Sequence, residues 1–485
     1  MEHRAEDEKR QRIEQLIEAV RNRWSREAAA EIAAFIEHHY RNGATEDLLP
    51  RALEILLTHT THSWQDEFRR QLQERVGAER GEALYQRYHD AFPMAYQAEN
   101  PPAVAVEDAL RLEALSEENT LGLQLYRPDK AAAGTLRLKI YHLGQPITLS
   151  AALPVLENLG VEVIDERPYA VTPTAGRPGG IRDLGLRYPA GLDDEEERLQ
   201  RLFPETLTMV WQGRAENDGF NKLSLHAGLD WREITILRAY GKYLRQAGTT
   251  LSQALIEATL AHYPHIARDL VQLFHARLSP SQRDPAQEQK LVTRIEAAFN
   301  DVPGLDEDRI LRRYLAAIRA TQRTNFYRRN VDGSHKSQLA LKLIPEQIPD
   351  MPLPLPAYEI YVYSPRFEGV HLRAGKVARG GIRWSDRQED FRTEVLGLLK
   401  AQVVKNSIIV PVGAKGSFCP KRLPQGDREA IQAEVKACYA DFIRGLLDIT
   451  DNRVGDRVVP PPDVVRHDGD DPYLVVAADK GTATF

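Results

Sequence analysis

KVARGGIRWSDRQEDFRTEVLGLLKAQVVKNSIIVPVGAKGSF, residues 376–418, carries the densest chemical pattern in this chain of 485 residues. Near its start, the pair Gly380-Gly381 stands between Arg379 and Arg383. Paired glycines let a backbone approach a ligand closely, and guanidinium groups bind carboxylates in a bidentate manner. The segment therefore predicts a site for an anionic ligand on an α/β scaffold.

A helix and a short strand are predicted after the glycine pair. Ser385, with Gln388 three residues later, has the pattern of a capping box, and the helix that follows delivers Lys405 near its end. SIIVPV then reads as a buried strand that runs into a glycine turn containing Lys415. Desolvation and nearby cations favour the neutral amine of such a lysine, which suits a catalytic group. A phosphate loop is excluded, because its lysine follows the last glycine, whereas Lys415 precedes Gly416.

The charge of this part of the chain is unusual. Residues 366–422 hold twelve Lys and Arg against five Asp and Glu, a local charge of 12 − 5 = +7 in a chain with net charge −6. Such a concentration can hold an anion, although a solvated basic surface is the alternative. We predict that four cations converge around Gly380-Gly381: Arg379, Arg383, Lys405 and Lys415.

A carboxylate near the end of the chain completes the candidate site. The apolar run 473–477 predicts a buried strand, and Asp479 follows just beyond it. Catalytic groups gather at strand ends in α/β sheets, so we expect Asp479 to face the same cleft as Lys415. The alternative is that Asp479 only begins a turn with Lys480 and Gly481.

Composition excludes several classes of protein. With 42% hydrophobic and 28% charged residues the chain is globular, and its acidity predicts no nucleic-acid partner. No apolar stretch approaches a membrane span and no secretory signal is visible, so we expect no membrane partner and a cytoplasmic location. The two cysteines, Cys419 and Cys438, exclude a disulfide scaffold. The pairs His59/His62 and His262/His265 lack a third ligand nearby, so we expect no metal site.

Periodicity and breaker residues predict a multidomain α/β (α+β) fold. Helical spacing dominates residues 10–120 and 195–330. Between these regions we predict a strand–helix–strand unit, made of the strand LRLKIYHL, a helix begun by Ser150, and the strand VEVIDERPYAV. Glu216, Asn217 and Asp218 are expected to form a turn satisfied by its own side chains, with ligand binding as the alternative. The predicted parts are a helical N-terminal region (1–130), the small α/β unit (131–190), a mainly helical domain (191–343), a Pro-rich linker (344–356) and a C-terminal α/β domain (357–485).

These motifs together resemble the amino-acid dehydrogenases, most closely the large bacterial NAD-specific glutamate dehydrogenases. The resemblance is dense over residues 376–418 and over VVAADKGTATF (475–485), and it extends to residues 213–246 and to the strand–helix–strand unit. Two positions depart from the small glutamate dehydrogenases. Arg379 stands where those enzymes carry lysine before the glycine pair, and Ser417 stands where they carry glycine.

The resemblance implies an activity and a role for each candidate residue. It implies NAD-dependent oxidation of L-glutamate to 2-oxoglutarate and ammonia, with Lys415 and Asp479 as catalytic residues. It places Arg379, Gly380, Gly381 and Arg383 beside the substrate carboxylates, with Lys405 on the α-carboxylate. It also implies an amino-acid-dehydrogenase type of C-terminal domain, an ACT-like regulatory unit that responds to a small-molecule effector, and a homo-oligomer.

The cofactor is expected to bind elsewhere. No G-x-G-x-x-G follows a strand in this sequence, and in the family the NAD-binding domain follows the motif around Asp479. We therefore expect a truncated chain that carries the regulatory and substrate-binding parts and is inactive alone. The alternatives are a dehydrogenase for another amino acid and a non-catalytic regulatory or interaction fragment.

Overall fold

The computed structural model describes residues 64–128, 131–145, 147–188, 196–248, 251–405, 410–479 and 482–483. These residues form two compact units. The first comprises residues 64–122, 139–145 and 167–183, and the second comprises the described parts of 123–138, 147–166 and 184–483. The helices predicted over residues 10–63, together with His59 and His62, lie outside the described residues.

Aromatic packing organises the core of the first unit. Its helices are α4 (Trp64–Val76), α5 (Ala78–Tyr88), α6 (Met94–Glu99) and α7 (Pro102–Glu113). Phe68 and Tyr96 are fully buried, and Phe92 stacks on Tyr96 with 4.6 Å between ring centroids. Asp108 of α7 is also buried and accepts hydrogen bonds from Lys139 Nζ and the Tyr141 hydroxyl, both at 2.6 Å. The helical prediction is confirmed over this described part of the region.

A four-stranded sheet follows, with strand order β1-β2-β4-β3. Its elements are β1 (Leu121–Tyr126), β2 (Thr135–Leu143), α8 (Leu149–Asn158), β3 (Glu162–Val171) and β4 (Gly179–Arg187). The predicted strand–helix–strand unit is confirmed as β2, α8 and β3, and β1 and β4 extend it. The prediction that Ser150 caps the helix is wrong, because α8 begins at Leu149 and Thr148 occupies the N-cap.

The middle of the chain is helical, as predicted, up to residue 320. Its helices are α9 (Glu196–Trp211), α10 (Leu223–His226), α11 (Trp231–Gln246), α12 (Gln253–His262), α13 (Pro264–Leu278), α14 (Pro285–Ala298) and α15 (Leu305–Ala320), with short 3-10 turns at Gly219–Lys222 and Phe299–Asp301. A capping box begins α11: the Asp230 side chain accepts from the Glu233 amide, and the Glu233 side chain accepts from the Asp230 amide. The following residues differ from the prediction, since β5 (Thr321–Thr324) and β6 (Leu339–Leu343) belong to the C-terminal sheet.

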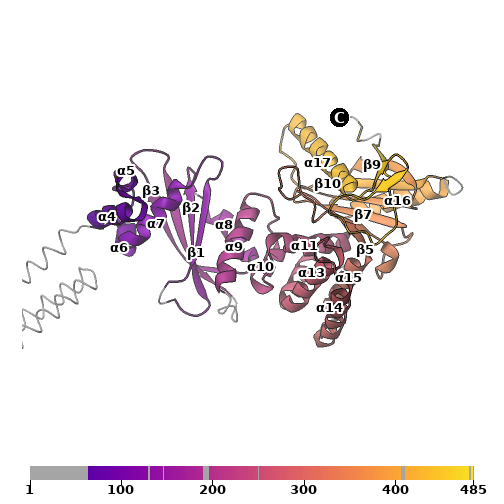
Figure 1. Ribbon diagram of the computed structural model, residues 1–485, viewed down its shortest axis with the longest axis horizontal. Coiled ribbons are helices and arrows are strands. Elements are labelled where there is room, and N and C mark those ends of the chain that lie inside the picture. The colour runs from indigo at the N-terminus through magenta and orange to yellow at the C-terminus, as the bar shows by residue number, and fades with distance from the viewer. Residues whose placement is uncertain are drawn as a thin grey trace, which may run out of the picture. The chain divides into compact units, whose positions relative to one another are not determined.

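The C-terminal sheet has seven strands in the order β13-β9-β10-β8-β7-β6-β5 (Figure 1). The remaining strands are β7 (Tyr358–Tyr363), β8 (Phe367–Arg373), β9 (Ala378–Trp384), β10 (Val412–Pro420) and β13 (Val475–Ala478). The pairs β13/β9 and β9/β10 are parallel, and the others are antiparallel. The Pro-rich run predicted as a linker connects β6 to β7, which are neighbours in this sheet, and contains the turn Pro345–Gln347.

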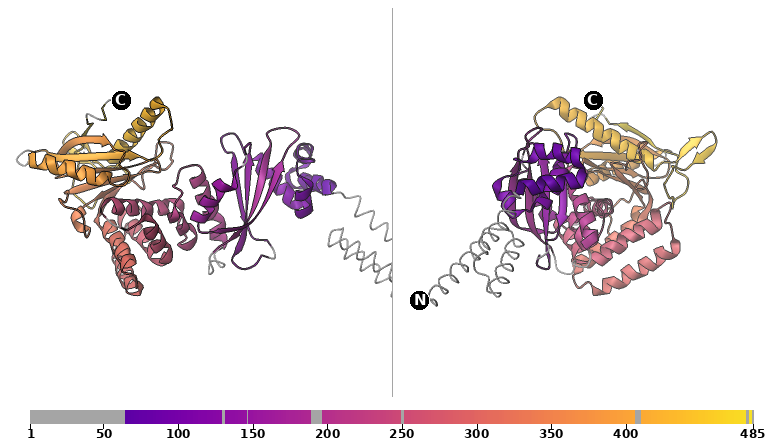
Figure 2. Two further views of the ribbon diagram at one scale, coloured as in Figure 1. Left: turned by 180° about the vertical axis from the view of Figure 1, so that it is seen from behind. Right: turned by 60° about the vertical axis from the view of Figure 1, so that its left-hand side comes forward.

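Helices cover both faces of this sheet. One face packs on α17 (Arg428–Asp448) through Ile382, Phe418 and Phe442. The opposite face packs on α16 (Phe391–Lys405) and on the middle helices in one large apolar cluster (Figure 1). The ribbon of β11 (Asn452–Val454) and β12 (Arg457–Val459) projects beyond α17 (Figure 2, right).

Candidate functional site

The register of three neighbouring strands brings the predicted site residues together. Ala477 of β13 lies opposite Gly381 of β9, and the β9/β10 register that pairs Gly413 with Arg379 and Gly416 with Ile382 places Lys415 beside Gly381. Side chains alternate between the two faces of a strand, so these positions share the face covered by α16. Arg379, Arg383 and Asp479 belong to the same face by the same alternation.

The two adjacent glycines have different roles. A Cβ atom on Gly380 would lie 1.5 Å from the carbonyl oxygen of Ala414, so this glycine lets β9 approach β10. A Cβ atom on Gly381 would lie 3.2 Å from Asp479 Cβ and 3.6 Å from Lys415 Nζ. Gly381 therefore lies close to both Lys415 and Asp479. That these two side chains serve one catalytic site stays a prediction.

Arg383 is held in place by an acidic residue of α16. Its Nη1 lies 3.0 Å from Glu394 Oε1, and its Nε lies 3.9 Å from Asp479 Oδ2. Ser385 donates a hydrogen bond to Glu394 Oε2 at 2.9 Å, which fixes the carboxylate from its other side. The prediction that Ser385 caps the helix is wrong, because α16 begins six residues later at Phe391.

The remaining two predicted cations of the site are Arg379 and Lys405. The Arg379 side chain is exposed, and its backbone carbonyl accepts a hydrogen bond from Gln402 of α16 at 3.3 Å. Lys405 is the last residue of α16, but its side chain lies outside the described residues, as do residues 407–409 of the predicted strand SIIVPV. Lys415 lies inside β10 rather than in a turn after a strand, because that strand continues to Pro420.

Asp479 immediately follows β13, as predicted. Its amide donates to Ile382 O at 2.9 Å, which continues the pairing with β9 by one residue. The Thr482 hydroxyl donates to Asp479 Oδ1 at 3.2 Å and accepts from the Trp384 amide at 2.8 Å. Asp479 thus begins a turn and also lies beside Gly381, so the two interpretations of this residue do not exclude each other.

Buried ion pairs anchor the segment that leads into β13. Arg323 of β5 pairs with Asp451 at 2.9 Å and with Asp468 at 2.6 Å. Asp471 pairs with Lys342 at 2.6 Å and with Arg373 at 2.8 Å. The two residues of each ion pair lie roughly 100 to 150 residues apart in the chain, so no local sequence pattern predicts this network.

A second network involves the acidic cluster near residue 216. Glu216 accepts hydrogen bonds from Lys242 Nζ at 2.7 Å and the Tyr363 hydroxyl at 2.9 Å, and it also pairs with Lys421. Burial raises the pKa of Glu216, but Lys421, Lys242 and Arg238 outweigh it and hold the pKa at about 2. The predicted self-satisfied turn is therefore wrong, because its carboxylates pair with distant cations.

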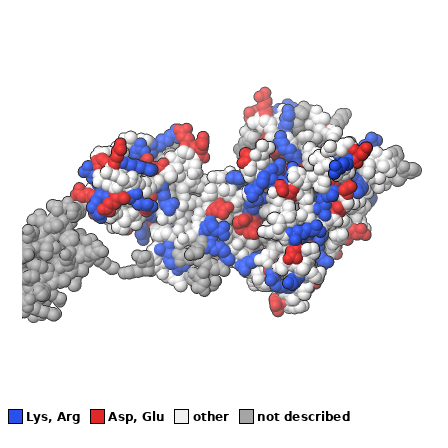
Figure 3. All heavy atoms as spheres, viewed as in Figure 1, with Lys and Arg blue, Asp and Glu red and all other residues white. Residues whose placement is uncertain are grey.

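The remaining surface and the histidines add no further cluster to the site. On the face drawn in Figure 3, acidic and basic side chains of the described residues are interspersed. His262 Nδ1 lies 3.2 Å from Glu307, and the described ranges contain no group of three or more His, Cys, Asp or Glu placed to hold a metal ion. None of the helices described here is both long and apolar enough to cross a membrane.

Comparisons with known proteins match nearly the whole described chain. Residues 294–485 match the family model "Bacterial NAD-glutamate dehydrogenase, catalytic domain". Residues 215–280, 120–199 and 71–115 match glutamate dehydrogenase models named helical motif 3, ACT3 domain and helical motif 2, respectively.

Three similar relatives are named NAD-specific glutamate dehydrogenase. The relative from Halomonas elongata is 49% identical over 90% of this chain and 27% of its own length. Those from Pseudomonas aeruginosa and Mycobacterium tuberculosis are 48% and 44% identical, over 28% and 27% of their own lengths. The chain thus spans little more than a quarter of the curated relatives that it matches.

Proposed function

We propose that the chain is part of a bacterial NAD-specific glutamate dehydrogenase and that its C-terminal sheet supplies the substrate-binding and catalytic groups of that enzyme. The reaction is the oxidative deamination of L-glutamate to 2-oxoglutarate and ammonia. The observation that supports this most directly is the convergence of Lys415 and Asp479 on Gly381, where a backbone without a side chain leaves room for a substrate.

Each side chain has a role suited to its chemistry. Oxidation at the α-carbon produces an imine, to which water adds. Asp479 takes a proton from the attacking water and passes it to the amine of the resulting carbinolamine. Asp479 then takes the remaining hydroxyl proton as the carbonyl forms and ammonia leaves. Lys415 donates a hydrogen bond to the same oxygen and stabilises the negative charge that develops on it.

Binding of the two substrate carboxylates requires cations. Arg383 lies beside Asp479 and presents a guanidinium group suited to a carboxylate. A second carboxylate needs a second cation, and Arg379 and Lys405 are the candidates on this side of the sheet. Gly380 contributes by allowing β9 and β10 to lie close together.

We propose NAD as the electron acceptor, following the names of the relatives. The residues of this chain do not fit a dinucleotide, because no G-x-G-x-x-G turn joins a strand to a helix in them. We therefore assign no part of hydride transfer to them. The match to an ACT3 model supports control by a small-molecule effector, and the family resemblance supports a cytoplasmic homo-oligomer.

Lys415→Ala in the longer enzyme tests the proposal. We expect kcat to fall by about 10²–10⁴-fold, with a much smaller rise in KM for glutamate, because a catalytic amine acts mainly in the transition state. Lys400→Ala is the matched control, since Lys400 is an exposed lysine of α16 in the same basic segment. A rise in KM alone would make Lys415 a binding residue and would contradict its catalytic role.

A further inference from the structure

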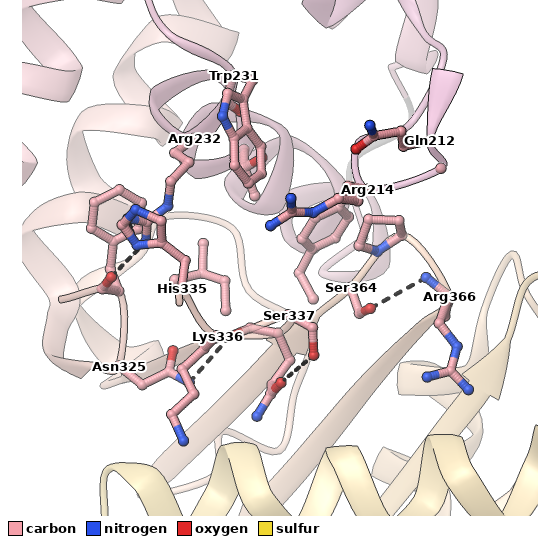
Figure 4. Close-up of a pocket in the computed structure, with 17 residues that line it drawn as sticks. Gln212, Arg214, Trp231, Arg232, Asn325, His335, Lys336, Ser337, Ser364 and Arg366 are labelled. Carbon is pink, nitrogen blue, oxygen red and sulfur yellow. Dashed lines mark hydrogen bonds between the residues drawn. The ribbon is translucent and has the colours of Figure 1, made fainter. Parts of the chain in front are cut away.

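A cavity of about 330 Å³ lies away from the site at Gly381, beside the start of α11 (Figure 4). Its walls come from the residues that follow α9, from the first turns of α11, from the β5–β6 connection and the start of β6, and from the end of β7. Ligand cavities commonly have volumes of roughly 300–1,000 Å³, so this one has room for a small organic molecule. Its lining contains four basic residues, Arg214, Arg232, Lys336 and Arg366, and no Asp or Glu.

Two of these cations already have acidic partners on α17. Lys336 Nζ lies 3.3 Å from Asp448, and Arg366 lies 2.8 Å from Glu434. In Figure 4 both side chains point away from Arg214 and Arg232. They therefore contribute little free positive charge to the cavity.

Arg214 and Arg232 have no such partner. No carboxylate of the described residues lies within 4.0 Å of either guanidinium group. Arg232 donates to the Phe326 carbonyl at 2.7 Å and contacts the imidazole of His335, with 3.0 Å between Nη1 and Nε2. Arg329 also contacts His335, at 2.7 Å. Two guanidinium groups thus share one neutral imidazole, which supplies no negative charge.

The nearby acids are occupied by other partners. Asp230 and Glu233 form the capping box of α11, and Glu205 accepts a hydrogen bond from the Trp231 indole at 3.1 Å. Burial lowers the pKa of Arg232 to about 10, with a further lowering by Arg329. Burial and the surrounding arginines, Arg232 first, lower the pKa of His335 to about 4. Both shifts have the direction expected of positive charge that is not neutralised locally.

Aromatic side chains complete the cavity. The guanidinium carbon of Arg232 lies 4.2 Å from the centre of the Phe326 ring, and that of Arg214 lies 5.7 Å from the centre of the Trp231 ring. Stacking on these rings orients the two cations without neutralising them. The rings also offer flat apolar surface for the rest of a ligand.

We propose that this cavity binds a small organic anion, whose carboxylate or phosphate group lies between Arg214 and Arg232 and whose apolar part contacts Trp231. This site is separate from the substrate site at Gly381 and does not depend on the proposed activity. Guanidinium groups recognise either kind of oxyanion, so the experiment must distinguish the two chemistries.

Titration calorimetry of the 485-residue chain provides the test, with inorganic phosphate, citrate and adenosine monophosphate as separate probes. We expect saturable binding of at least one probe, weakened by added salt. Phosphate chemistry is indicated if phosphate and adenosine monophosphate bind, and carboxylate chemistry if citrate binds. Tighter binding of adenosine monophosphate than of phosphate would indicate a contribution from the aromatic walls.

Substitutions of the two arginines test whether the probe binds in this cavity. We expect Arg214→Gln and Arg232→Gln each to raise the Kd by about tenfold or more, since each removes one charge-assisted contact. Arg312→Gln, at an exposed position of α15, is the matched loss of one arginine and should leave the Kd unchanged. Lys415→Ala should also leave it unchanged, which separates this cavity from the substrate site.

Three results would overturn the proposal. These are the absence of saturable binding of all three probes at millimolar concentration, an unchanged Kd in Arg214→Gln, and loss of binding in Lys415→Ala. Because Arg214 is exposed, its replacement is expected to leave the fold intact, so the test does not depend on the more buried Arg232.

Discussion

Replacing Gly380 by alanine tests how closely β9 and β10 must approach in the C-terminal sheet. The new Cβ would lie 1.5 Å from Ala414 O and 2.4 Å from its carbonyl carbon, both backbone atoms that no side-chain rotation can move. Ordinary contact needs about 3.4 Å or more, so the strands must separate locally by about 1.5–2 Å. Such a separation breaks the ladder hydrogen bonds on either side of the new methyl group.

The cost follows from the broken contacts. Loss of about two ladder hydrogen bonds, at about 1 kcal/mol each, adds to an overpacking cost of about 1–3 kcal/mol. We therefore expect Gly380→Ala to destabilise the β9–β10 pairing by about 3–5 kcal/mol. Since 1.4 kcal/mol corresponds to a factor of ten, amides of β9 and β10 should exchange with deuterium at least about 100-fold faster.

Gly381→Ala is the matched control, one residue along the same strand. Its Cβ would meet Asp479 Cβ at 3.2 Å, Lys415 Nζ at 3.6 Å and Asp479 Cα at 3.7 Å, and a local shift of a few tenths of an ångström relieves the tightest of these contacts. Its effect on amide exchange should be small, below about 1 kcal/mol, whereas in the longer enzyme it should raise KM for glutamate by occupying the substrate space. Wild-type exchange rates in Gly380→Ala would refute the reasoning, as would equal exchange rates in the two variants.

Two further predictions concern carboxylates. Asp479→Asn in the longer enzyme keeps the shape but removes the proton-accepting group, so kcat should fall at every pH; near-normal kcat across the pH range would make Asp479 structural. For Glu216, the folded pKa of about 2 lies below the ordinary 4.5, so its stabilising contribution is complete above about pH 4.5 and is lost as pH falls towards 2. Glu216→Gln should therefore lower the free energy of unfolding by about 2 kcal/mol at neutral pH and flatten its decline between pH 4.5 and 2, measured by urea denaturation. A decline as steep as that of the wild type would contradict this assignment.

Local patterns in the sequence were sufficient to predict several elements of the fold. The spacing of apolar residues predicted α11, and alternation predicted β2, because both patterns depend on neighbours within a few residues. Two predictions made from local patterns were wrong, and both concerned where a helix begins. Ser150 and Ser385 carry hydroxyl groups that suit a helix N-cap, yet the helices begin at other residues, because tertiary packing determines where a helix starts.

The candidate site was predicted in part. Arg383, Lys415 and Asp479 belong to motifs whose residue types could be recognised one by one in the sequence. Their meeting at Gly381 depends on the register of β13, β9 and β10, which pairs residues about 34 and 96 positions apart. The same limitation hid Glu394 as the partner of Arg383, since a glutamate in the first turn of a helix has no distinctive pattern.

The sequence by itself determined the resemblance to the glutamate dehydrogenases, the chemical groups available to the site, and the periodicity that makes each segment a helix or a strand. Only the tertiary structure decided which cations are neutralised: Lys336 and Arg366 pair with α17, whereas Arg214 and Arg232 have no carboxylate among the described residues within ion-pair distance. The physical reason is that periodicity follows from covalent neighbours, whereas the environment of a charge is set by residues that chain folding brings near.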